Sequence, residues 1–354
     1  MSLQKIAVLG LGKVGTLAAK LLHQGGFAVT GFDSRNPQAS LPFEVQTIDL
    51  VSDDGIRAAT VGFDAVLSCL PYRLNRRIAI AAHAQGMHYF DLTEDVSTTQ
   101  ASIDLGKTSR GLMAPQCGLA PGFVGIVGAA QVGAFEKCRS LRLRVGALPQ
   151  NPTGLMGYAF NWSPEGVVNE YLNDCEVIED GVRKTVSSME WHETLYVDGV
   201  MLEAFTTSGG LGTLCETFHG KVANVDYKSV RYPGHMQLMN FFFHELLMRE
   251  RRDLAGEILT NAKPPVNNDV VYVHVSSEGM LDGRLQRREF VRAYRPIELA
   301  GSPQTAIAWT TSASVVAVIE LVRDRALPQQ GFLKQEEIPL DAFLATTTGR
   351  LFSA

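Results

Sequence analysis

The sequence predicts an α/β protein with an N-terminal Rossmann domain, a doubly wound parallel sheet, followed by an α+β domain with a mostly antiparallel sheet. Three observations predict this fold class. Strand-like and helix-like runs alternate over the first 120 residues, a G-x-G-x-x-G motif follows the first strand-like run, and hairpin patterns replace the alternation afterwards. Strands that alternate with helices pair in parallel through right-handed crossovers. The length of 354 residues also favours two domains over one.

The N-terminal domain is expected to contain six strands with helices between them. The strand-like runs are Ile6–Leu9, Ala28–Phe32, Glu44–Ile48, Ala65–Cys69, Tyr89–Asp91 and Leu112–Ala114. The helical runs are Val14–His23, Val51–Ala59, Leu74–Gln85 and Ser97–Ser109. These elements complete a dinucleotide-binding topology, so we place the Rossmann domain at residues 1–120.

Residues 121–304 have the pattern of a separate domain for substrate binding and oligomerisation. Leucine and valine alternate with arginine over Ser140–Gly146, which is the period-two pattern of a half-buried strand. Asp-Gly pairs at 180–181 and 198–199 favour tight hairpins, because both residue types accept positive φ. The domain is therefore expected to be built mainly from antiparallel pairs.

The last part of the chain adds one more hairpin and a long helix. A turn is expected at Gly279–Gly283, between the strand-like runs Val270–Ser276 and Leu285–Tyr294. Thr305–Val322 is the pattern of a helix with an apolar face. We expect residues 305–354 to be C-terminal helices that pack back on the Rossmann domain.

Composition and charge exclude several classes of protein. The chain carries 32 basic and 37 acidic residues, whereas a phosphate backbone usually requires a basic excess, so no nucleic acid partner is expected. The opening residues lack a secretory signal pattern and the five cysteines form no CxxC pair, so we expect a cytoplasmic protein with reduced thiols. Pro121 and Gln131 interrupt the uncharged run 117–135, so no membrane span is expected. No histidine has a partner at metal-ligand spacing, so no metal is expected.

A GLGKVG motif after the first strand predicts a dinucleotide site. Gly10 permits the tight turn, Gly12 lets the backbone approach a pyrophosphate, and Gly15 lets helix and strand pack closely. The helix that begins around Lys13 and Val14 offers unpaired N–H groups and the positive end of its dipole to that anion. The alternative is a Rossmann fold that has lost its cofactor.

Asp33 predicts which dinucleotide is preferred. It lies 18 positions after Gly15, at the end of the second strand-like run. Its carboxylate would accept hydrogen bonds from the adenosine ribose and repel a 2′-phosphate, so NAD is expected rather than NADP. Arg35 lies two residues later and could offset part of the repulsion, so NADP or use of both cofactors is the alternative.

Two loops are expected to complete the cofactor site. One is a proline loop after the fourth strand-like run, which should pass near the second ribose and the nicotinamide, and the other is a glycine-rich turn that opens an apolar helix. Both follow strands at the carboxyl edge of the sheet, where ligands bind in open α/β folds. The residues are Cys69, Leu70, Pro71, Gly118, Leu119 and Ala120. Ordinary turn chemistry is the alternative for both loops.

Further motifs carry a resemblance to a known family. They are Gly118–Gly122, Asn161–Gly166, Thr207–Leu211, Tyr227–His235, Thr305–Leu327 and Gly331–Pro339. Together with the glycine motif and the proline loop, they make the chain similar over nearly its whole length to the saccharopine dehydrogenase family, and most similar to its lysine 6-dehydrogenases. The chain departs from the saccharopine reductases, which resemble GLDPG, in having Ala120 at the acidic position. This departure counts against a bulky amino-dicarboxylate substrate.

The resemblance implies NAD(P)-dependent oxidation at a carbon that bears nitrogen, with an amino acid as the small-molecule substrate. For a lysine 6-dehydrogenase the products of L-lysine and NAD are 2-aminoadipate 6-semialdehyde, which cyclises to piperideine-6-carboxylate, together with ammonia and NADH. A saccharopine-type or carboxyspermidine-type secondary-amine dehydrogenase or reductase is the alternative within the same chemistry. A non-catalytic NAD-binding sensor is the alternative of another class. A homodimer is expected because exposed antiparallel sheets commonly pair across a two-fold axis.

The proposed chemistry needs a carboxylate anchor and a proton acceptor. Arginine binds a carboxylate in a bidentate manner, and Arg231 is our candidate, with a structural salt bridge as the alternative. The substrate amine titrates near pH 10.4 and must lose a proton, for which Asp91 and His235 are the candidates. Either residue could instead be structural, Asp91 in holding its loop and His235 in capping or packing a helix. Glu94 is a weaker candidate than Asp91.

Two aromatic residues are expected to line the aliphatic part of the substrate. Tyr158 and Trp162 belong to the stretch that most resembles the lysine 6-dehydrogenases. Packing in the hydrophobic core is the alternative for both. Ser163 and Pro164 also have the pattern of a simple helix start.

Overall fold

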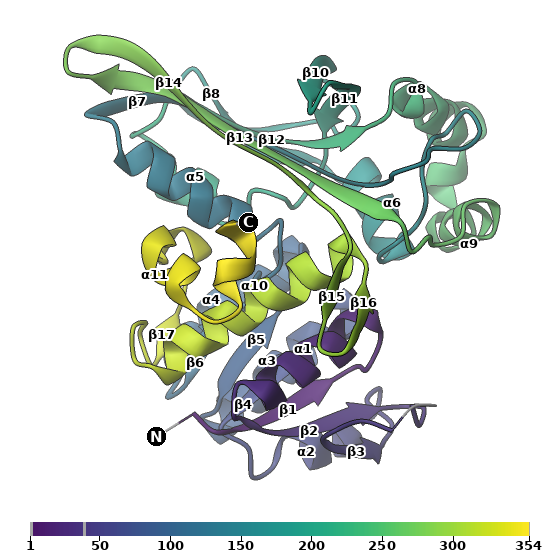
Figure 1. Cartoon of the computed structure of the whole chain (residues 1–354), viewed down its shortest axis with the longest axis vertical. Helices are drawn as coiled ribbons and strands as arrows, with labels where there is room; N and C mark the ends of the chain where they lie inside the picture. Colours follow the sequence, from purple (N-terminus) through teal and green to yellow (C-terminus); the bar gives the residue numbers. More distant parts are fainter. Residues whose placement is uncertain (1–2, 38–39, 354) are drawn as a thin grey trace. The chain divides into compact units, whose positions relative to one another are not determined.

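The computed structural model describes residues 3–37 and 40–353, which divide into two compact units (Figure 1). The first unit contains the described residues up to Ile126 and from Ala308 onward, and the second contains Val127–Ile307. The two divisions fall inside helices α5 (Phe123–Gly133) and α10 (Ala306–Arg323), whereas the sequence pattern predicts them after residues 120 and 304.

The first unit contains a parallel sheet of seven strands, so the predicted Rossmann fold is confirmed. The sheet order is β17-β6-β5-β4-β1-β2-β3 (Figure 1). The strands are β1 (Lys5–Leu9), β2 (Ala28–Asp33), β3 (Glu44–Thr47), β4 (Ala65–Ser68), β5 (His88–Asp91), β6 (Leu112–Ala114) and β17 (Gly331–Phe332). The first six match the expected runs, and β17 is an addition that pairs in parallel with β6. The chain order reverses at β1, which makes the carboxyl edge beside β1 the ligand-binding edge of such a sheet.

Helices connect the strands of this sheet in the order that the sequence predicts. They are α1 (Lys13–Gln24), α2 (Asp53–Thr60), α3 (Tyr72–Gln85) and α4 (Val96–Gly106). Ser52 and Asp95 cap α2 and α4 by accepting backbone hydrogen bonds. The C-terminal elements η3 (Gln335–Glu337), α11 (Leu340–Ala345) and η4 (Gly349–Ser353) also belong to this unit. An aromatic contact joins η4 to the start of α5, where the Phe352 ring stacks on Phe123 with 4.1 Å between the ring centroids.

The second unit contains an eight-stranded mixed sheet whose main order is β10-β11-β12-β7-β13-β14, with β8 pairing with both β12 and β9. Its strands are β7 (Lys137–Pro149), β8 (Cys175–Glu179), β9 (Val182–Val186), β10 (Glu193–Val197), β11 (Val200–Thr206), β12 (Asn224–Arg231), β13 (Asp269–Leu281) and β14 (Arg284–Tyr294). Only β12 and β7 pair in parallel, so the sheet is mostly antiparallel as expected. The two predicted Asp-Gly hairpins join β8 to β9 and β10 to β11.

Short helices and a small ribbon complete the second unit. The helices are α6 (Pro164–Leu172), α7 (Leu214–Phe218), α8 (His235–Asn240), η1 (Phe241–Glu245), η2 (Met248–Glu250) and α9 (Arg252–Ala262). The ribbon pairs β15 (Ile297–Leu299) with β16 (Ser302–Gln304). Ser163 caps α6 through Gly166 N at 3.0 Å, and Pro164 begins the helix, as a simple helix start predicts.

The prediction of a turn at Gly279–Gly283 is wrong at its start, because the turn begins later in the chain. Strand β13 continues through Gly279 to Leu281, with an irregularity in register between Glu278 and Gly279, and the turn occupies only Asp282 and Gly283. A Cβ atom at Gly279 would lie 2.7 Å from the carbonyl oxygen of Lys137, so close packing inside the sheet requires this glycine.

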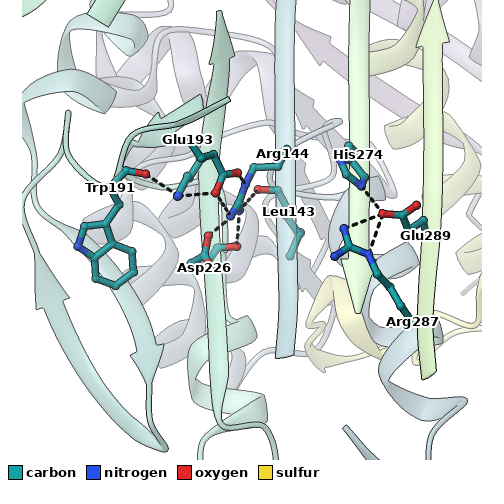
Figure 2. A network of polar contacts seen from close by, with 9 residues as sticks. Leu143, Arg144, Trp191, Glu193, Asp226, His274, Arg287 and Glu289 are labelled. Carbon is teal, nitrogen blue, oxygen red and sulfur yellow. Dashed lines mark hydrogen bonds and ion pairs between the residues drawn. The ribbon is translucent and has the colours of Figure 1, made fainter. Parts of the chain in front are cut away.

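Charged side chains form a buried network on one side of the second sheet (Figure 2). Arg144 on β7 pairs with Glu193 on β10 and, at 2.5 Å, with Asp226 on β12. Lys228 also pairs with Glu193 at 2.7 Å. The two cations beside Glu193 outweigh its burial and lower its pKa to about 2. Each cation therefore has a carboxylate partner, and the network holds three strands together.

Helix α10 is the longest apolar helix of the described residues. Its 18 residues have a mean hydropathy of 1.4, which by length and composition alone would suffice to cross a membrane. However, 83% of these residues are buried within the protein, as in the core helix of a globular fold, so this one helix is weak evidence for a membrane span.

Asp269 caps this helix from a distant strand, and its replacement should destabilise the second unit. Its carboxylate accepts hydrogen bonds from Ala306 N at 2.6 Å and Ile307 N at 3.0 Å. Asp269→Ala would remove the acceptor that these two backbone N–H groups share, one of them buried and one half-buried, so we expect the free energy of unfolding to fall by about 2 kcal/mol. Asp269→Asn keeps one acceptor and should cost about half as much. Urea denaturation followed by circular dichroism measures both, and an alanine variant as stable as the wild type would contradict the assigned cap.

Candidate functional site

The glycine motif of the first unit has the geometry of a dinucleotide-binding loop. Gly10 has a φ of 90°, and a Cβ atom there would lie 2.9 Å from the carbonyl oxygen of Cys69. A Cβ atom at Gly15 would lie 1.9 Å from the carbonyl oxygen of Gly10, so helix α1 can approach the loop only with glycine. Gly12 is exposed and has no heavy atom within 4 Å of the position of a Cβ, which leaves its backbone open to a ligand.

The N-terminus of α1 is suited to an anion. Gly12 is its N-cap residue and supplies no side-chain cap, and the first turn contains no acidic residue. Lys13 is exposed and Val14 is half-buried beside it. The first N–H groups of a helix have no partner within it, and its dipole favours negative charge at this end. These residues fit a dinucleotide pyrophosphate.

Asp33 lies at the end of β2 beside the glycine loop. One carboxylate oxygen accepts a hydrogen bond from Leu11 N at 2.7 Å, and the other accepts one from Arg35 N at 3.0 Å. A carboxylate oxygen has two acceptor positions, so each oxygen keeps capacity for a ribose hydroxyl. The Arg35 side chain is exposed. The structure therefore brings Asp33 and the glycine loop together, as the sequence predicts.

The two expected loops lie after β4 and β6 in the same unit. Cys69 and Leu70 are half-buried and Pro71 is exposed as the N-cap residue of α3. The carbonyl oxygen of Gly118 accepts hydrogen bonds from Phe123 N and, at 2.8 Å, from the Ser314 hydroxyl. Leu119 is buried and Ala120 is half-buried in this turn. Burial and the nearby Asp91 raise the pKa of Cys69 to about 12, so its thiol stays protonated.

Asp91 ends β5 as a fully buried carboxylate. One oxygen accepts from Thr93 N at 3.0 Å and Gln116 N at 2.9 Å, and the other accepts from the Tyr89 hydroxyl at 2.6 Å. Burial raises the pKa of Asp91 to about 6, although these hydrogen bonds oppose the shift. Asp91 thus ties the end of β5 to the segment after β6.

Glu94, three residues further on, differs from Asp91 in its contacts. Its carboxylate is half-buried and accepts no hydrogen bond from another of the described residues. Burial raises the pKa of Glu94 to about 7. Both carboxylates therefore titrate far closer to neutrality than an exposed acid does.

The second unit contains a buried cation without a carboxylate partner. Arg231, at the end of β12, is 3% exposed. Its Nε donates to the Tyr171 hydroxyl at 2.6 Å and its Nη1 donates to the carbonyl oxygen of Val230 at 2.8 Å, but no ion pair joins it to a carboxylate of the described residues. Burial works against its charge, but Tyr171, Tyr158 and Glu170 raise its pKa, so the guanidinium stays charged.

The two expected aromatic residues differ in their contact with Arg231: the Tyr158 ring lies against its guanidinium, and no such contact is found for Trp162 among the described residues. The Arg231 guanidinium carbon lies 4.8 Å from the ring centroid of Tyr158 and 5.5 Å from that of Tyr171. Trp162 is half-buried and packs against the same hydrophobic cluster. It lies close enough to Tyr158 to act on its pKa, but the Tyr158 hydroxyl has no hydrogen-bond partner of normal geometry in the described part of the chain.

His235 is completely buried at the start of α8. Its Nε2 lies 3.0 Å from the Tyr171 hydroxyl and its Nδ1 lies 3.0 Å from the carbonyl oxygen of Met156. Burial and the charge of Arg231 lower its pKa to about 3. The structure thus brings His235, Arg231 and Tyr158 together in the second unit, and it places Asp91 in the first unit.

Two neighbours of Arg231 were not found by sequence reasoning. Tyr171, on α6, links Arg231 to His235. Glu203, on β11, is the cross-strand neighbour of Arg231, but its carboxylate accepts from Gly234 N at 2.9 Å and Met236 N at 2.7 Å. The backbone of the turn that follows β12 thereby binds the carboxylate of this cross-strand neighbour. Tyr171 lies five residues after the motif Asn161–Gly166, whereas the pairing of Glu203 has no sequence signal.

No group of three or more histidine, cysteine or acidic side chains with the arrangement of a metal site occurs within residues 3–37 and 40–353.

The parallel sheet, the glycine loop and Asp33 define a Rossmann-type dinucleotide-binding protein, and its second unit contains a buried arginine with no ion pair to a carboxylate of the described residues. The saccharopine dehydrogenase NADP binding domain matches residues 6–113, and the saccharopine dehydrogenase C-terminal domain matches residues 118–351. The chain therefore belongs to the saccharopine dehydrogenase family and is a saccharopine dehydrogenase-like NAD(P)-dependent oxidoreductase.

Solved structures share this fold at low sequence identity. Apo saccharopine dehydrogenase (L-Glu forming) from Saccharomyces cerevisiae is similar with a TM-score of 0.72 and 16% identity over 96% of both chains. DAP dehydrogenase from C. glutamicum in complex with DAP has a TM-score of 0.51 and 12% identity over 100% of this chain and 99% of that chain. An engineered D-amino acid dehydrogenase bound to NADP+ has a TM-score of 0.50 and 12% identity over 99% of this chain and 98% of that chain. Similarity at these identities shows the fold alone.

Proposed function

We propose that this protein catalyses the NAD-dependent oxidative deamination of the ε-amine of L-lysine. The products would be 2-aminoadipate 6-semialdehyde, which cyclises to piperideine-6-carboxylate, together with ammonia and NADH. One observation carries the substrate class. Arg231 is a buried guanidinium with no ion pair to any carboxylate of the described residues, and a buried charge of this kind is expected to bind an anion.

An amino acid carboxylate suits this arginine better than another anion does. A guanidinium has five N–H donors in one plane, and Arg231 uses two of them within the described chain. The remaining donors match the two oxygens of a carboxylate. The neighbouring Tyr158 ring and the half-buried Trp162 supply apolar surface for a short aliphatic chain.

The proton of the substrate amine is proposed to pass to Asp91. A lysine ammonium titrates near 10.4, so the reactive neutral amine forms only when a group accepts its proton. With a pKa of about 6, Asp91 is ionised at neutral pH and can still hold a proton during turnover. Bound NAD(P) supplies the acceptor for the hydride. After Asp91 has released this proton to solvent, its carboxylate would accept a proton from the water that attacks the imine carbon, and ammonia would leave.

NAD should be preferred over NADP, although the matching family domain is described as NADP binding. The charge of Asp33 would repel a 2′-phosphate. Asp33→Asn keeps an oxygen for Leu11 N but removes the negative charge. The preference for NAD, measured as kcat/KM with NAD divided by kcat/KM with NADP, should therefore fall by about tenfold or more. Asp33→Ala should narrow it as well. A wild type that turns over faster with NADP would instead assign the selection to Arg35.

Absorbance at 340 nm with NAD and a panel of amines tests the proposed reaction. L-lysine should produce NADH, with ammonia released in equal amount and an aldehyde detectable when the ring opens. Saccharopine is the decisive comparison, because one solved structure of this fold is a saccharopine dehydrogenase. NADH from saccharopine and none from L-lysine at any pH would replace the proposal by the secondary-amine alternative.

The homodimer and the cytoplasmic location stay predictions.

A further inference from the structure

Tyr171 lies between the two polar side chains that the sequence singled out in the second unit. It comes from α6, whereas Arg231 ends β12 and His235 begins α8. Its hydroxyl oxygen lies 2.6 Å from Arg231 Nε and 3.0 Å from His235 Nε2. All three side chains are buried, so these contacts are made without competition from bulk solvent.

The donor and acceptor chemistry of the groups determines the direction of each hydrogen bond in the series from Met156 O through His235 and Tyr171 to Arg231. A carbonyl oxygen only accepts, so His235 Nδ1 must carry the hydrogen that faces Met156 O at 3.0 Å. A neutral imidazole then has its lone pair on Nε2, which accepts from the Tyr171 hydroxyl. The Tyr171 oxygen in turn accepts from Arg231 Nε, which can only donate.

Protonation of His235 would break this arrangement. Nε2 would become a second donor to the Tyr171 oxygen, and the hydroxyl hydrogen would lose its acceptor in a buried place. A second positive charge would also lie close to Arg231. Burial and Arg231 accordingly hold the pKa of His235 near 3, so the neutral tautomer is the stable one.

The surroundings keep the imidazole in one orientation. Its ring is stacked on Phe205 at an interplanar angle of 9° and lies 5.1 Å from the Tyr158 ring centroid. Glu203 accepts from Gly234 N and Met236 N, the backbone groups on either side of His235. His235, at one end of this series of hydrogen bonds, is therefore held in place by its flanking backbone as well as by side-chain packing.

We propose that Tyr171 is a positioning residue for the carboxylate anchor, and that His235 acts through Tyr171 rather than on the substrate. This inference rests on the proposed function. The Tyr171 oxygen occupies Arg231 Nε, and Val230 O takes one hydrogen of Nη1, so the guanidinium is held in one plane. A side-on approach through Nε is closed to a ligand. The carboxylate must then bind the terminal Nη1–Nη2 edge.

Tyr171→Phe tests the inference because it removes only the hydroxyl. KM for L-lysine should rise about tenfold, while kcat changes less than threefold and KM for NAD is unchanged. Tyr232→Phe is the matched control, since its hydroxyl donates to Pro149 O at 2.9 Å and makes no hydrogen bond to Arg231. It should leave all three constants unchanged. A rise in KM that is equal in both variants would overturn the inference.

Two variants of His235 separate positioning from a general loss of packing. His235→Gln offers an amide oxygen near the place of Nε2 and can still accept from Tyr171, whereas His235→Leu cannot. KM should therefore rise less in the glutamine variant than in the leucine variant. A fall in kcat of about 10²–10⁴-fold in the glutamine variant would instead make His235 a proton acceptor on the substrate.

Calorimetric binding of L-norleucine separates this inference from the proposed reaction. L-norleucine has the carboxylate and carbon chain of lysine but lacks the ε-amine. In the presence of NAD, Tyr171→Phe should bind it about tenfold more weakly than the wild type, and Tyr232→Phe should bind it as the wild type does. This result without oxidation of L-lysine would support the anchor and refute the reaction. Equal binding by all three proteins, or none by the wild type, would overturn the inference.

Discussion

Replacing Arg231 with alanine should raise KM for L-lysine about 10²-fold and leave Kd for NAD unchanged. The loss corresponds to about 2–3 kcal/mol, the value of a charge-assisted bidentate hydrogen bond. Arg231 belongs to the second unit, whereas the glycine loop and Asp33 belong to the first, so cofactor affinity should not depend on it. Arg231→Lys keeps the charge without the planar fork and should recover only part of the affinity. Steady-state kinetics and calorimetry with NAD measure both constants.

Arg144 provides the matched control for this prediction. It is a buried arginine of the same sheet, but Glu193 and Asp226 pair with it (Figure 2). Arg144→Ala leaves those carboxylates without their shared cation and should destabilise the protein by about 3–5 kcal/mol, with KM for L-lysine unchanged in the folded enzyme. If Arg231 were also structural, its alanine variant would lose stability while the surviving enzyme kept its KM.

Replacing Asp91 with asparagine should lower kcat by about 10²–10⁴-fold, because the proposed proton acceptor disappears while the shape of the side chain is kept. The asparagine oxygen can still accept from Thr93 N and Gln116 N, so the loops should stay in place. Asp64→Asn is the control, since Asp64 also accepts from two backbone N–H groups, those of Gln4 and Lys5. Its kcat should match that of the wild type.

The pH profile of kcat/KM gives the same prediction a second readout. Activity should fall as pH drops through about 6, where Asp91 takes up a proton, and should climb toward pH about 9–10 as lysine loses its proton. Asp91→Asn should remove the acid limb. If Glu94→Gln removes it and Asp91→Asn does not, the proton passes to Glu94, whose pKa is about 7.

The cofactor half of the fold was predictable because its signals are local. A strand, three glycines at fixed spacing and an acidic residue at the end of the next strand lie within 33 residues, and together they indicate a Rossmann fold. The pairings of the second unit are not local. β12 and β7 are parallel neighbours although some 80 residues separate them, and β17 joins the first sheet from residue 331. No sequence periodicity reports such contacts.

The candidate site shows the same limit in single residues. Arg231 and His235 could be named from one motif, but the hydroxyl that links them comes from Tyr171 on another helix. Glu203 is the cross-strand neighbour of Arg231, and a sequence argument would pair their charges. The backbone N–H groups of Gly234 and Met236 bind that carboxylate instead, and no ion pair joins Glu203 to Arg231.

The most direct test compares L-lysine with 1,5-diaminopentane, which is lysine without its carboxylate, in the wild type and in Arg231→Ala. The wild type should favour L-lysine in kcat/KM by about 10²-fold, because only L-lysine can bind the guanidinium. In Arg231→Ala the two substrates should have nearly equal kcat/KM. A preference for L-lysine that is the same in both proteins would contradict Arg231 as the carboxylate anchor.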